Sequence, residues 1–140
     1  RSKQEHTQSI LASLHWAGIN ADEPIVIQSE RIGTHQKMIE ELIACGKAYR
    51  CFCAPDDHVK RHQAVFGPDD LFIKYDKYCR DRVVTNADKD KPYVVRFKLP
   101  DDRAEVTFND IIRGTVTFAL DQLEDFIIAR PCGGPMYNFV

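Results

Sequence analysis

The 140-residue chain lacks a long apolar run, a strong net charge and an even number of cysteines. No stretch is long and apolar enough to span a bilayer, and no signal peptide is visible, so we expect no membrane partner. A net charge of −2 excludes a protein that binds nucleic acid through its overall charge. The five scattered cysteines are unlike a secreted disulfide scaffold, and we therefore expect a reducing, cytoplasmic location.

Signatures of nucleotide binding and of nucleophilic catalysis are missing as well. The chain has neither a G-x-G-x-x-G nor a P-loop pattern, and residues 132–135 are typical of a turn rather than of an anion-binding loop. No Ser-His-Asp or Cys-His order has a recognisable nucleophile context, so we predict no catalytic residue. The chain also lacks an initiator Met and stops inside an apolar run, from which we expect a fragment of a larger protein.

A capping box and a glycine define the first predicted helix. Ser2 offers a hydroxyl at the N-cap and Glu5 a carboxylate three residues later, which predicts a helix over residues 2–17. Gly18 is a natural stop for this helix, because glycine accepts the backbone conformation that ends helices. We expect Trp16 to pack at the end of the helix.

The residues from 24 to 53 predict an alternation of extended and helical segments. Residues 25–27 predict a short extended segment, and a second helix, capped by Ser29 or Thr34, is expected to end at Gly46. Residues 48–52 then predict a strand. The order helix, short strand, helix, strand is typical of one half of an α/β fold.

The second half of the chain predicts one helix and several short strands. Pro55, followed by two aspartates, favours a helix that runs to about residue 65. Alternating and β-branched residues predict strands at 93–99, 106–108, 115–118 and 126–129. This half is therefore expected to be α+β and mostly antiparallel.

Cys51 and Cys53 form the closest pair of cysteines in the chain. Side chains two residues apart on a strand point to the same side, so both thiols can bind one zinc ion if further ligands join them. Cys79 is the obvious third ligand. The residues considered for the fourth position are His58, His62 and Tyr75. The competing interpretation is a set of reduced, partly buried thiols without metal.

A series of short blocks stands in a specific order along the chain. The blocks are residues 1–5 (RSKQE), 28–31 (QSER), 46–53 (GKAYRCFC), 75–76 with 79–80 (YD, CR), 92–97 (PYVVRF), 112–118 (IRGTVTF), 125–128 (DFII) and 134–139 (GPMYNF). Together they resemble bacterial glutamyl-tRNA synthetase, a class I aminoacyl-tRNA synthetase, over the whole length of the chain. No single block is specific, and the specificity comes from their order and spacing.

The resemblance implies an α/β fold, namely part of a split Rossmann-type catalytic domain with an inserted α+β subdomain that binds the tRNA acceptor end. Residues 1–50 resemble the end of the first Rossmann half. Residues 51–130 resemble the inserted subdomain, and residues 131–140 the start of the second Rossmann half. The two ATP motifs of the family would lie outside this chain, so the fragment itself is expected to be inactive.

The resemblance also implies functional residues at matching positions. Tyr137 would line the glutamate pocket. A structural zinc ion would be held by Cys51, Cys53, Tyr75 and Cys79, with Asp81 as the alternative ligand. We further expect contacts to tRNA from Arg50, Arg80 and Arg113.

The activity implied by the resemblance is the activation of glutamate with ATP and magnesium, followed by transfer of glutamate to the 3′ end of tRNA(Glu) in translation. The intact protein is expected to be a monomer. Two alternatives remain open. One is the truncated glutamyl-queuosine tRNA synthetase paralogue, and the other is a non-enzymatic zinc-binding interaction module.

Overall fold

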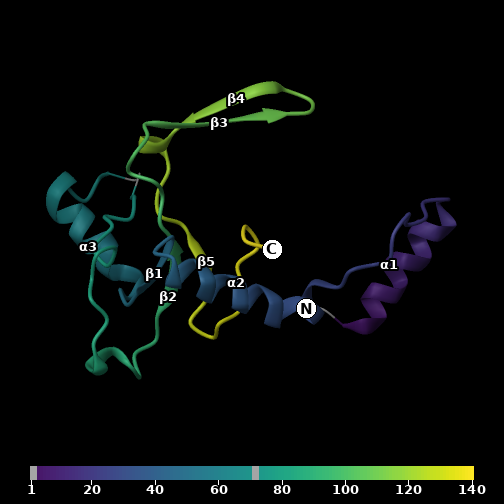
Figure 1. Ribbon diagram of the computed structural model, residues 1–140, viewed down its shortest axis with the longest axis horizontal. Helices are drawn as coiled ribbons and strands as arrows, with labels where there is room; N and C mark the ends of the chain where they lie inside the picture. The colour runs from purple at the N-terminus through teal and green to yellow at the C-terminus, as the bar shows by residue number, and fades with distance from the viewer. Residues whose placement is uncertain (1–2, 71–72) are drawn as a thin grey trace. The chain divides into compact units, whose positions relative to one another are not determined.

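A computed structural model describes residues 3–70 and 73–140 of the chain. The chain divides into two compact units, Arg1–Glu30 and Arg31–Val140, and each is described by itself. Figure 1 labels the helices and strands. Across the described residues, every helix is too short or too polar to cross a membrane.

The first unit contains helix α1, which spans Gln4–Trp16 and confirms the first predicted helix. Its N-cap is Lys3, whose side chain makes no capping hydrogen bond, and the cap predicted at Ser2 lies outside the described residues. Gly18 has a φ of +77° and its N–H donates to the carbonyl of His15 at 3.0 Å, which confirms Gly18 as the stop signal.

Two predictions for the first unit are wrong. Trp16 does not pack at the helix end but is 89% exposed, because α1 buries none of its residues. Residues 25–27 form no strand, since no strand among the described residues pairs with them. An extended segment without a hydrogen-bonding neighbour gains none of the cross-strand contacts that stabilise a sheet.

The second unit begins with helix α2, which spans Ile32–Ala44 and confirms the second predicted helix. Neither Ser29 nor Thr34 caps it. The N-cap is Arg31, which lacks a side-chain cap bond. The 3₁₀ turn Gln28–Arg31 runs directly into the helix, so no extended residue is available there for a capping side chain.

A three-stranded sheet forms the centre of the second unit. Its strands are β1 (Ala48–Cys51), β2 (Val94–Phe97) and β5 (Ile127–Ala129), in the order β1-β2-β5, and both pairings are antiparallel. The sheet confirms three predicted strands and their antiparallel arrangement. Helix α2 lies against this sheet (Figure 1), and the buried core residues are Ile39, Ala48, Val95, Ile128 and Ala129.

Helix α3 spans Pro55–Phe66 and follows β1 almost directly. Proline at the first helical position and aspartates in the first turn explain its start, as predicted. The carboxylate of Asp57 accepts a hydrogen bond from the backbone N–H of Ala54 at 2.8 Å, which satisfies a donor at the helix terminus. Between α3 and β2 the described chain contains one short 3₁₀ turn, Asn86–Asp88.

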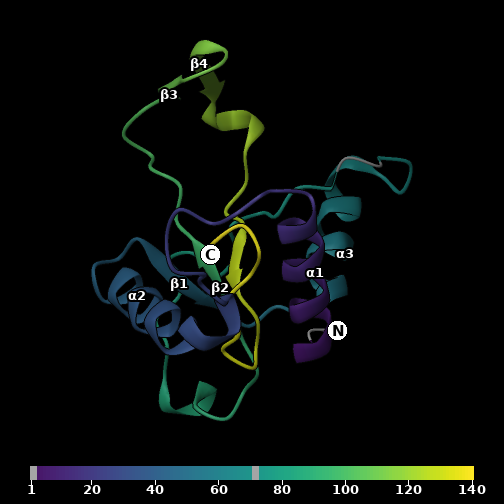
Figure 2. The same cartoon turned by 90° about the vertical axis from the view of Figure 1, so that its right-hand side faces the viewer.

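Strands β3 (Glu105–Asp110) and β4 (Gly114–Ala119) form a separate two-stranded hairpin, which confirms two further predicted strands. A 3₁₀ turn, Leu120–Gln122, follows β4. Figures 1 and 2 both draw the hairpin away from the three-stranded sheet. Most of its residues are exposed, so the hairpin contributes little to the core.

Candidate metal centre

The end of β1 places Cys51 and Cys53 near a third thiol. Cys51 is the last residue of β1 and is 1% exposed, whereas Cys53 lies just beyond the strand and is partly buried. Cys79 reaches the same place from the turn after residue 75 and is also 1% exposed. Tyr49 and Tyr75 are buried together with Cys51 and Cys79 in a cluster that is separate from the core between α2 and the sheet.

The three thiols are close enough to share one ion. The sulfur atoms of Cys51, Cys53 and Cys79 lie within 4.8 Å of one another, and those of Cys53 and Cys79 are 3.6 Å apart. Two sulfurs on a tetrahedral zinc ion would be about 3.8 Å apart, given Zn–S bonds of about 2.3 Å. All five cysteines of the chain are free thiols. The donor set therefore fits a soft metal ion such as zinc.

The hydroxyl of Tyr75 lies beside the thiols. Its oxygen is 3.2 Å from the sulfur of Cys51 and accepts a hydrogen bond from the backbone N–H of Cys79 at 3.0 Å. The guanidinium carbon of Arg96 lies 3.6 Å from the centroid of the Tyr75 ring, and Arg96 is itself 7% exposed. The Cys51 sulfur and the Cys79 N–H thus hold the tyrosine oxygen beside the thiol group, while Arg96 packs on the ring.

The other residues considered for the fourth ligand position have different partners. The carboxylate of Asp81 is 85% exposed and pairs with the ammonium group of Lys98 at 3.2 Å. The ring of His58 makes an edge contact with the Tyr75 ring, with centroids 6.4 Å apart. The Nε2 atom of His62 is 3.1 Å from a carboxylate oxygen of Asp70. The structure therefore brings Tyr75, and none of these three, into hydrogen-bond contact with a thiol of the group.

The electrostatic surroundings act differently on the two cysteines at the end of β1. Burial opposes ionisation of Cys51, but hydrogen bonds from Tyr75, from the backbone of Cys53 and from Arg96 lower its pKa below the usual value. Burial raises the pKa of Cys53 to about 12, although a hydrogen bond from Arg61 acts in the opposite direction. Burial and the contact with Cys51 raise the pKa of Tyr75. A bound cation would lower all three pKa values.

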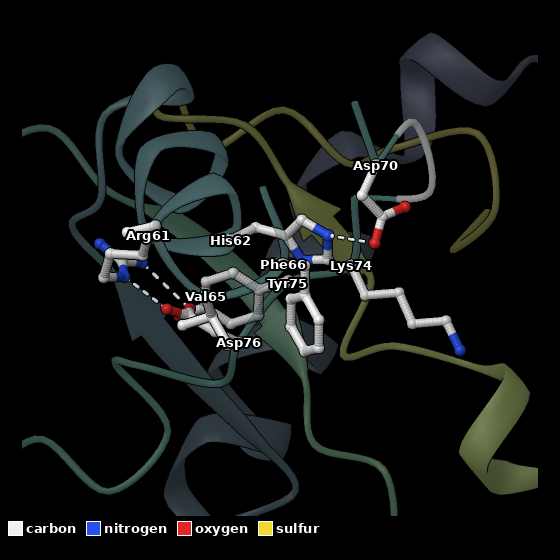
Figure 3. A pocket seen from close by; sticks show the side chains of 9 residues that line it. Arg61, His62, Val65, Phe66, Asp70, Lys74, Tyr75 and Asp76 are labelled. Atoms are coloured by element: carbon white, nitrogen blue, oxygen red, sulfur yellow. Dashed lines mark hydrogen bonds and ion pairs between the residues drawn. The ribbon is translucent and has the colours of Figure 1, made fainter. Parts of the chain in front are cut away.

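A cavity of about 610 Å³ adjoins the cluster on the side of α3. Its lining is mainly apolar, and it is bounded by the Arg61–Asp76 ion pair and by the His62–Asp70 hydrogen bond. Figure 3 shows these two pairs at opposite sides, with the ring of Tyr75 between them. The same Tyr75 side chain therefore faces both the cavity and the thiols.

The arginines predicted to contact tRNA lie on different elements. Arg50 is on β1, where its guanidinium is 3.5 Å from the carboxylate of Glu40 and lies over the ring of Tyr93. Arg113 lies in the exposed turn between β3 and β4, where its backbone N–H donates to a carboxylate oxygen of Asp110 at 2.8 Å. Both side chains are accessible from solvent, Arg50 in part.

Arg80 has a buried environment. Its side chain is 6% exposed and contacts the carboxylates of Asp101 at 2.7 Å and Asp125 at 3.4 Å. It also donates to the carbonyl of Leu99. These contacts give Arg80 a structural role in joining the turn after Cys79 to the segments that follow β2 and precede β5.

Tyr137 lies in the C-terminal segment that folds back on β5. Ala129 and Pro135 form an isolated bridge, and the backbone N–H of Met136 donates to the carbonyl of Ile128 at 2.8 Å. Gly133 has a φ of +75°, which agrees with the turn predicted at residues 132–135. The side chain of Tyr137 is 90% exposed and lies outside the thiol cluster.

Sequence reasoning missed two residues at this site. Arg61 donates to the sulfur of Cys53 at 3.5 Å, and its position three residues after His58 on the same helix could have revealed it. Asp125 is fully buried and accepts hydrogen bonds from the hydroxyl of Tyr49 at 2.7 Å and from the N–H of Leu99 at 3.0 Å. No local pattern in the sequence marks Asp125 as buried.

Comparison with known families assigns the chain to a protein family. All of residues 1–140 match the family described as "tRNA synthetases class I (E and Q), catalytic domain". The chain belongs to this class I tRNA synthetase family. A glutamate–tRNA ligase of Geobacter sulfurreducens is 42% identical over 141 residues, and one of Syntrophotalea carbinolica is 41% identical over 140 residues. Each alignment covers 100% of this chain and 29% of the relative.

Solved structures agree with this class I synthetase assignment. A glutamate tRNA ligase from Elizabethkingia meningosepticum, crystallised in complex with its amino acid, matches with a TM-score of 0.77 and 27% identity. The match covers 99% of this chain and 31% of that chain. The chain therefore has the α/β fold found in these synthetases and spans less than one third of the length of the relatives that it matches.

Proposed function

We propose that the chain is part of a glutamate–tRNA ligase. The intact enzyme would activate glutamate with ATP and magnesium and transfer it to the 3′ end of tRNA(Glu). The observation that carries this proposal is the match to glutamate–tRNA ligases over the whole chain at about 40% identity. The same relatives favour a glutamate–tRNA ligase over the glutamyl-queuosine paralogue and over a non-enzymatic module.

Within that enzyme, residues 51–130 would form the subdomain inserted into a split Rossmann-type domain, between the ends contributed by residues 1–50 and 131–140. The antiparallel pairing of β2 with β5 and the β3–β4 hairpin, all within residues 51–130, support an inserted α+β unit, because a Rossmann half is built on parallel strands. Strand β1, most of which precedes residue 51, pairs with β2 in the same sheet. Its task would be positional, since bringing the terminal ribose to the activated amino acid lowers the entropic part of the barrier.

The thiol group would hold a structural zinc ion through Cys51, Cys53 and Cys79, with the hydroxyl of Tyr75 as the fourth ligand. A bound zinc ion would cross-link the end of β1 to the turn after residue 75, two segments that are distant in sequence. The close approach of three sulfurs and one oxygen supports this assignment. Asp81 remains the alternative ligand only if its carboxylate leaves Lys98.

The remaining assignments follow from the same proposal. Tyr137 would line the glutamate pocket, and its exposure leaves it free to face the part of the enzyme that lies outside this chain. Arg50 and Arg113, which are accessible, are better placed than the buried Arg80 to contact tRNA phosphates. The intact protein would act as a monomer in the cytoplasm.

The direct test is aminoacylation by the intact protein that contains this chain. The purified enzyme should attach radiolabelled glutamate to tRNA(Glu) in the presence of ATP and magnesium, and the 140-residue chain alone should not. A matched reaction with tRNA that carries queuosine in its anticodon distinguishes a glutamate–tRNA ligase from the glutamyl-queuosine paralogue. Labelling only of the queuosine base, or no labelling of any tRNA, would contradict the proposal.

A further inference from the structure

Arg61 lies against the thiol group in a fixed orientation. Its guanidinium forms two hydrogen bonds to the carboxylate of Asp76, one from Nε and one from Nη2, the latter at 3.0 Å. One face of the guanidinium lies 4.4 Å from the centroid of the Tyr78 ring. The same Nη2 atom is 3.5 Å from the sulfur of Cys53. Carboxylate and ring together fix the direction in which this nitrogen donates.

The local sequence explains why Arg61 reaches Cys53. Helix α3 begins at Pro55, two residues after Cys53, and its N-terminal turn is anchored by the bond from Ala54 to Asp57. Positions 57 and 61 are four residues apart and share one face of the helix. Because Asp57 is tied to Ala54, the residue after Cys53, Arg61 on the same helix face lies close to the Cys53 thiol.

Asp76 belongs to the turn that also carries two of the proposed ligands. This turn runs from Tyr75 to Cys79, and Lys77 within it has a φ of +58°, a left-handed conformation that is unusual for a residue other than glycine. The N–H of Tyr78 donates to the carboxylate of Asp76 at 3.3 Å, so the carboxylate is held from inside the turn. The turn thus orients Asp76 and Cys79 together.

The charge of a metal-loaded group favours hydrogen-bond donors around its sulfur atoms. Three thiolates on one divalent ion leave an excess of one negative charge, and burying an uncompensated charge is unfavourable. Arg96 lies on the Cys51 side, over the ring of Tyr75. Arg61 lies on the Cys53 side, next to a polar cavity of about 260 Å³ that reaches Cys53 and Cys79. Arg82 lines the same cavity but pairs with Asp88, whereas Arg61 donates to a sulfur of the group.

We propose that Arg61 is a positioning residue of the thiol cluster, which, held by Asp76, donates an N–H···S hydrogen bond to Cys53 and so orients and stabilises this sulfur as a thiolate ligand of the metal-loaded site. This inference rests on the proposed zinc site and adds a residue that acts through a ligand. Outer partners of metal ligands typically contribute about 10- to 100-fold to metal affinity.

The test measures the zinc dissociation constant of the 140-residue chain by competition with a chelating indicator. Arg61→Gln should weaken zinc binding about 10-fold or more, because Cys53 loses its N–H···S donor. Lys60→Gln is the matched control, since it removes the same charge from an exposed position on the same helix and should change the constant less than about twofold.

A spectroscopic measurement separates positioning from simple support of the fold. In the cobalt-substituted chain, the thiolate-to-cobalt charge-transfer band should shift in Arg61→Gln, shift less in Arg61→Lys and stay in place in Lys60→Gln. If the unsubstituted chain binds neither zinc nor cobalt, the proposed metal site and the role of Arg61 are both refuted. If it binds zinc and Arg61→Gln behaves like Lys60→Gln, only the role of Arg61 is refuted.

Discussion

The three-stranded sheet and the β3–β4 hairpin are built from similar residues but differ in burial. Val95 on β2 is 4% exposed and Ile128 on β5 is 1% exposed. On the hairpin, Phe108 is 48% exposed and Phe118 is 44% exposed, although their rings stack with centroids 6.2 Å apart. The sheet is covered by α2, whereas no described residues bury the apolar face of the hairpin.

The comparison shows that two strands can be fully paired without contributing to the core. A hairpin satisfies its backbone hydrogen bonds locally through its own register, from Glu105 opposite Ala119 to Asp110 opposite Gly114. Burial requires a second layer, and a two-stranded ribbon alone is only marginally stable in water. We therefore expect the stability of the second unit to come mainly from the sheet, α2 and the buried polar network around Asp125.

The largest expected effect is the loss of Asp125. Asp125→Ala removes the acceptor of Tyr49 and Leu99 and leaves the buried guanidinium of Arg80 with one carboxylate fewer. Breaking a buried ion pair typically costs about 3–5 kcal/mol, so the free energy of unfolding measured in urea should fall by about that amount. Asp110→Ala on the hairpin, which removes an acceptor of two backbone N–H groups, should cost about 1 kcal/mol. Equal losses of stability in Asp125→Ala and Asp110→Ala would contradict the proposed difference between the sheet and the hairpin.

The second effect compares one residue type in the two regions. Ile128→Ala deletes a side chain that is 1% exposed in the core, and such deletions typically cost about 2–5 kcal/mol. Ile112→Ala deletes the same atoms at the hairpin turn, where Ile112 is 93% exposed, and should change stability by less than about 0.5 kcal/mol. Thermal unfolding followed by circular dichroism measures both. A large loss for Ile112→Ala would mean that the hairpin belongs to the core.

The smallest effect is a pH dependence in the loop before β2. Hydrogen bonds from Lys91 and from the backbone of Thr85, with the nearby Arg82, lower the pKa of Asp88 to about 2. Because the folded-state pKa lies below the unfolded value of about 3.9, this contribution to stability is complete above about pH 5. It is lost as the pH falls towards 2.

Urea unfolding at several pH values between 2 and 5 tests this prediction. Asp88→Asn should make the free energy of unfolding less dependent on pH in that range than in the unsubstituted chain. Asp90→Asn is the control, because it removes the same charge from an exposed position in the same loop. The same pH dependence in Asp88→Asn and in the unsubstituted chain would show that Asp88 does not contribute to it.

Local signals predicted the helices and strands where they were strong. Pro55 with its aspartates marked the start of α3, and Gly18 marked the end of α1. The cap predicted at Ser29 or Thr34 failed because a 3₁₀ turn occupies the entry to α2. These outcomes have one reason. A capping or start signal is followed when the residues next to it adopt the backbone conformation that the signal requires.

The candidate site was predictable only in part. The spacing of Cys51 and Cys53 pointed to a shared metal ion, with Cys79 as the third ligand. The resemblance to a synthetase family then favoured Tyr75, with Asp81 as the alternative, over the histidines of α3. Local reasoning could not choose between Tyr75 and the histidines of α3. That choice depends on the turn at residues 75–79, in which Lys77 is left-handed. A lysine does not indicate a left-handed conformation, so the sequence of the turn does not predict it.

The sequence by itself determined the positions of most helices and strands and the family, because caps, alternation and ordered motifs are written in neighbouring residues. The tertiary structure decided which apolar strands are buried, which carboxylate is enclosed by Tyr49 and Arg80, and which oxygen lies beside the thiols. These properties depend on groups that are distant in the chain, and their energies exist only once folding has brought the groups together and removed water from between them.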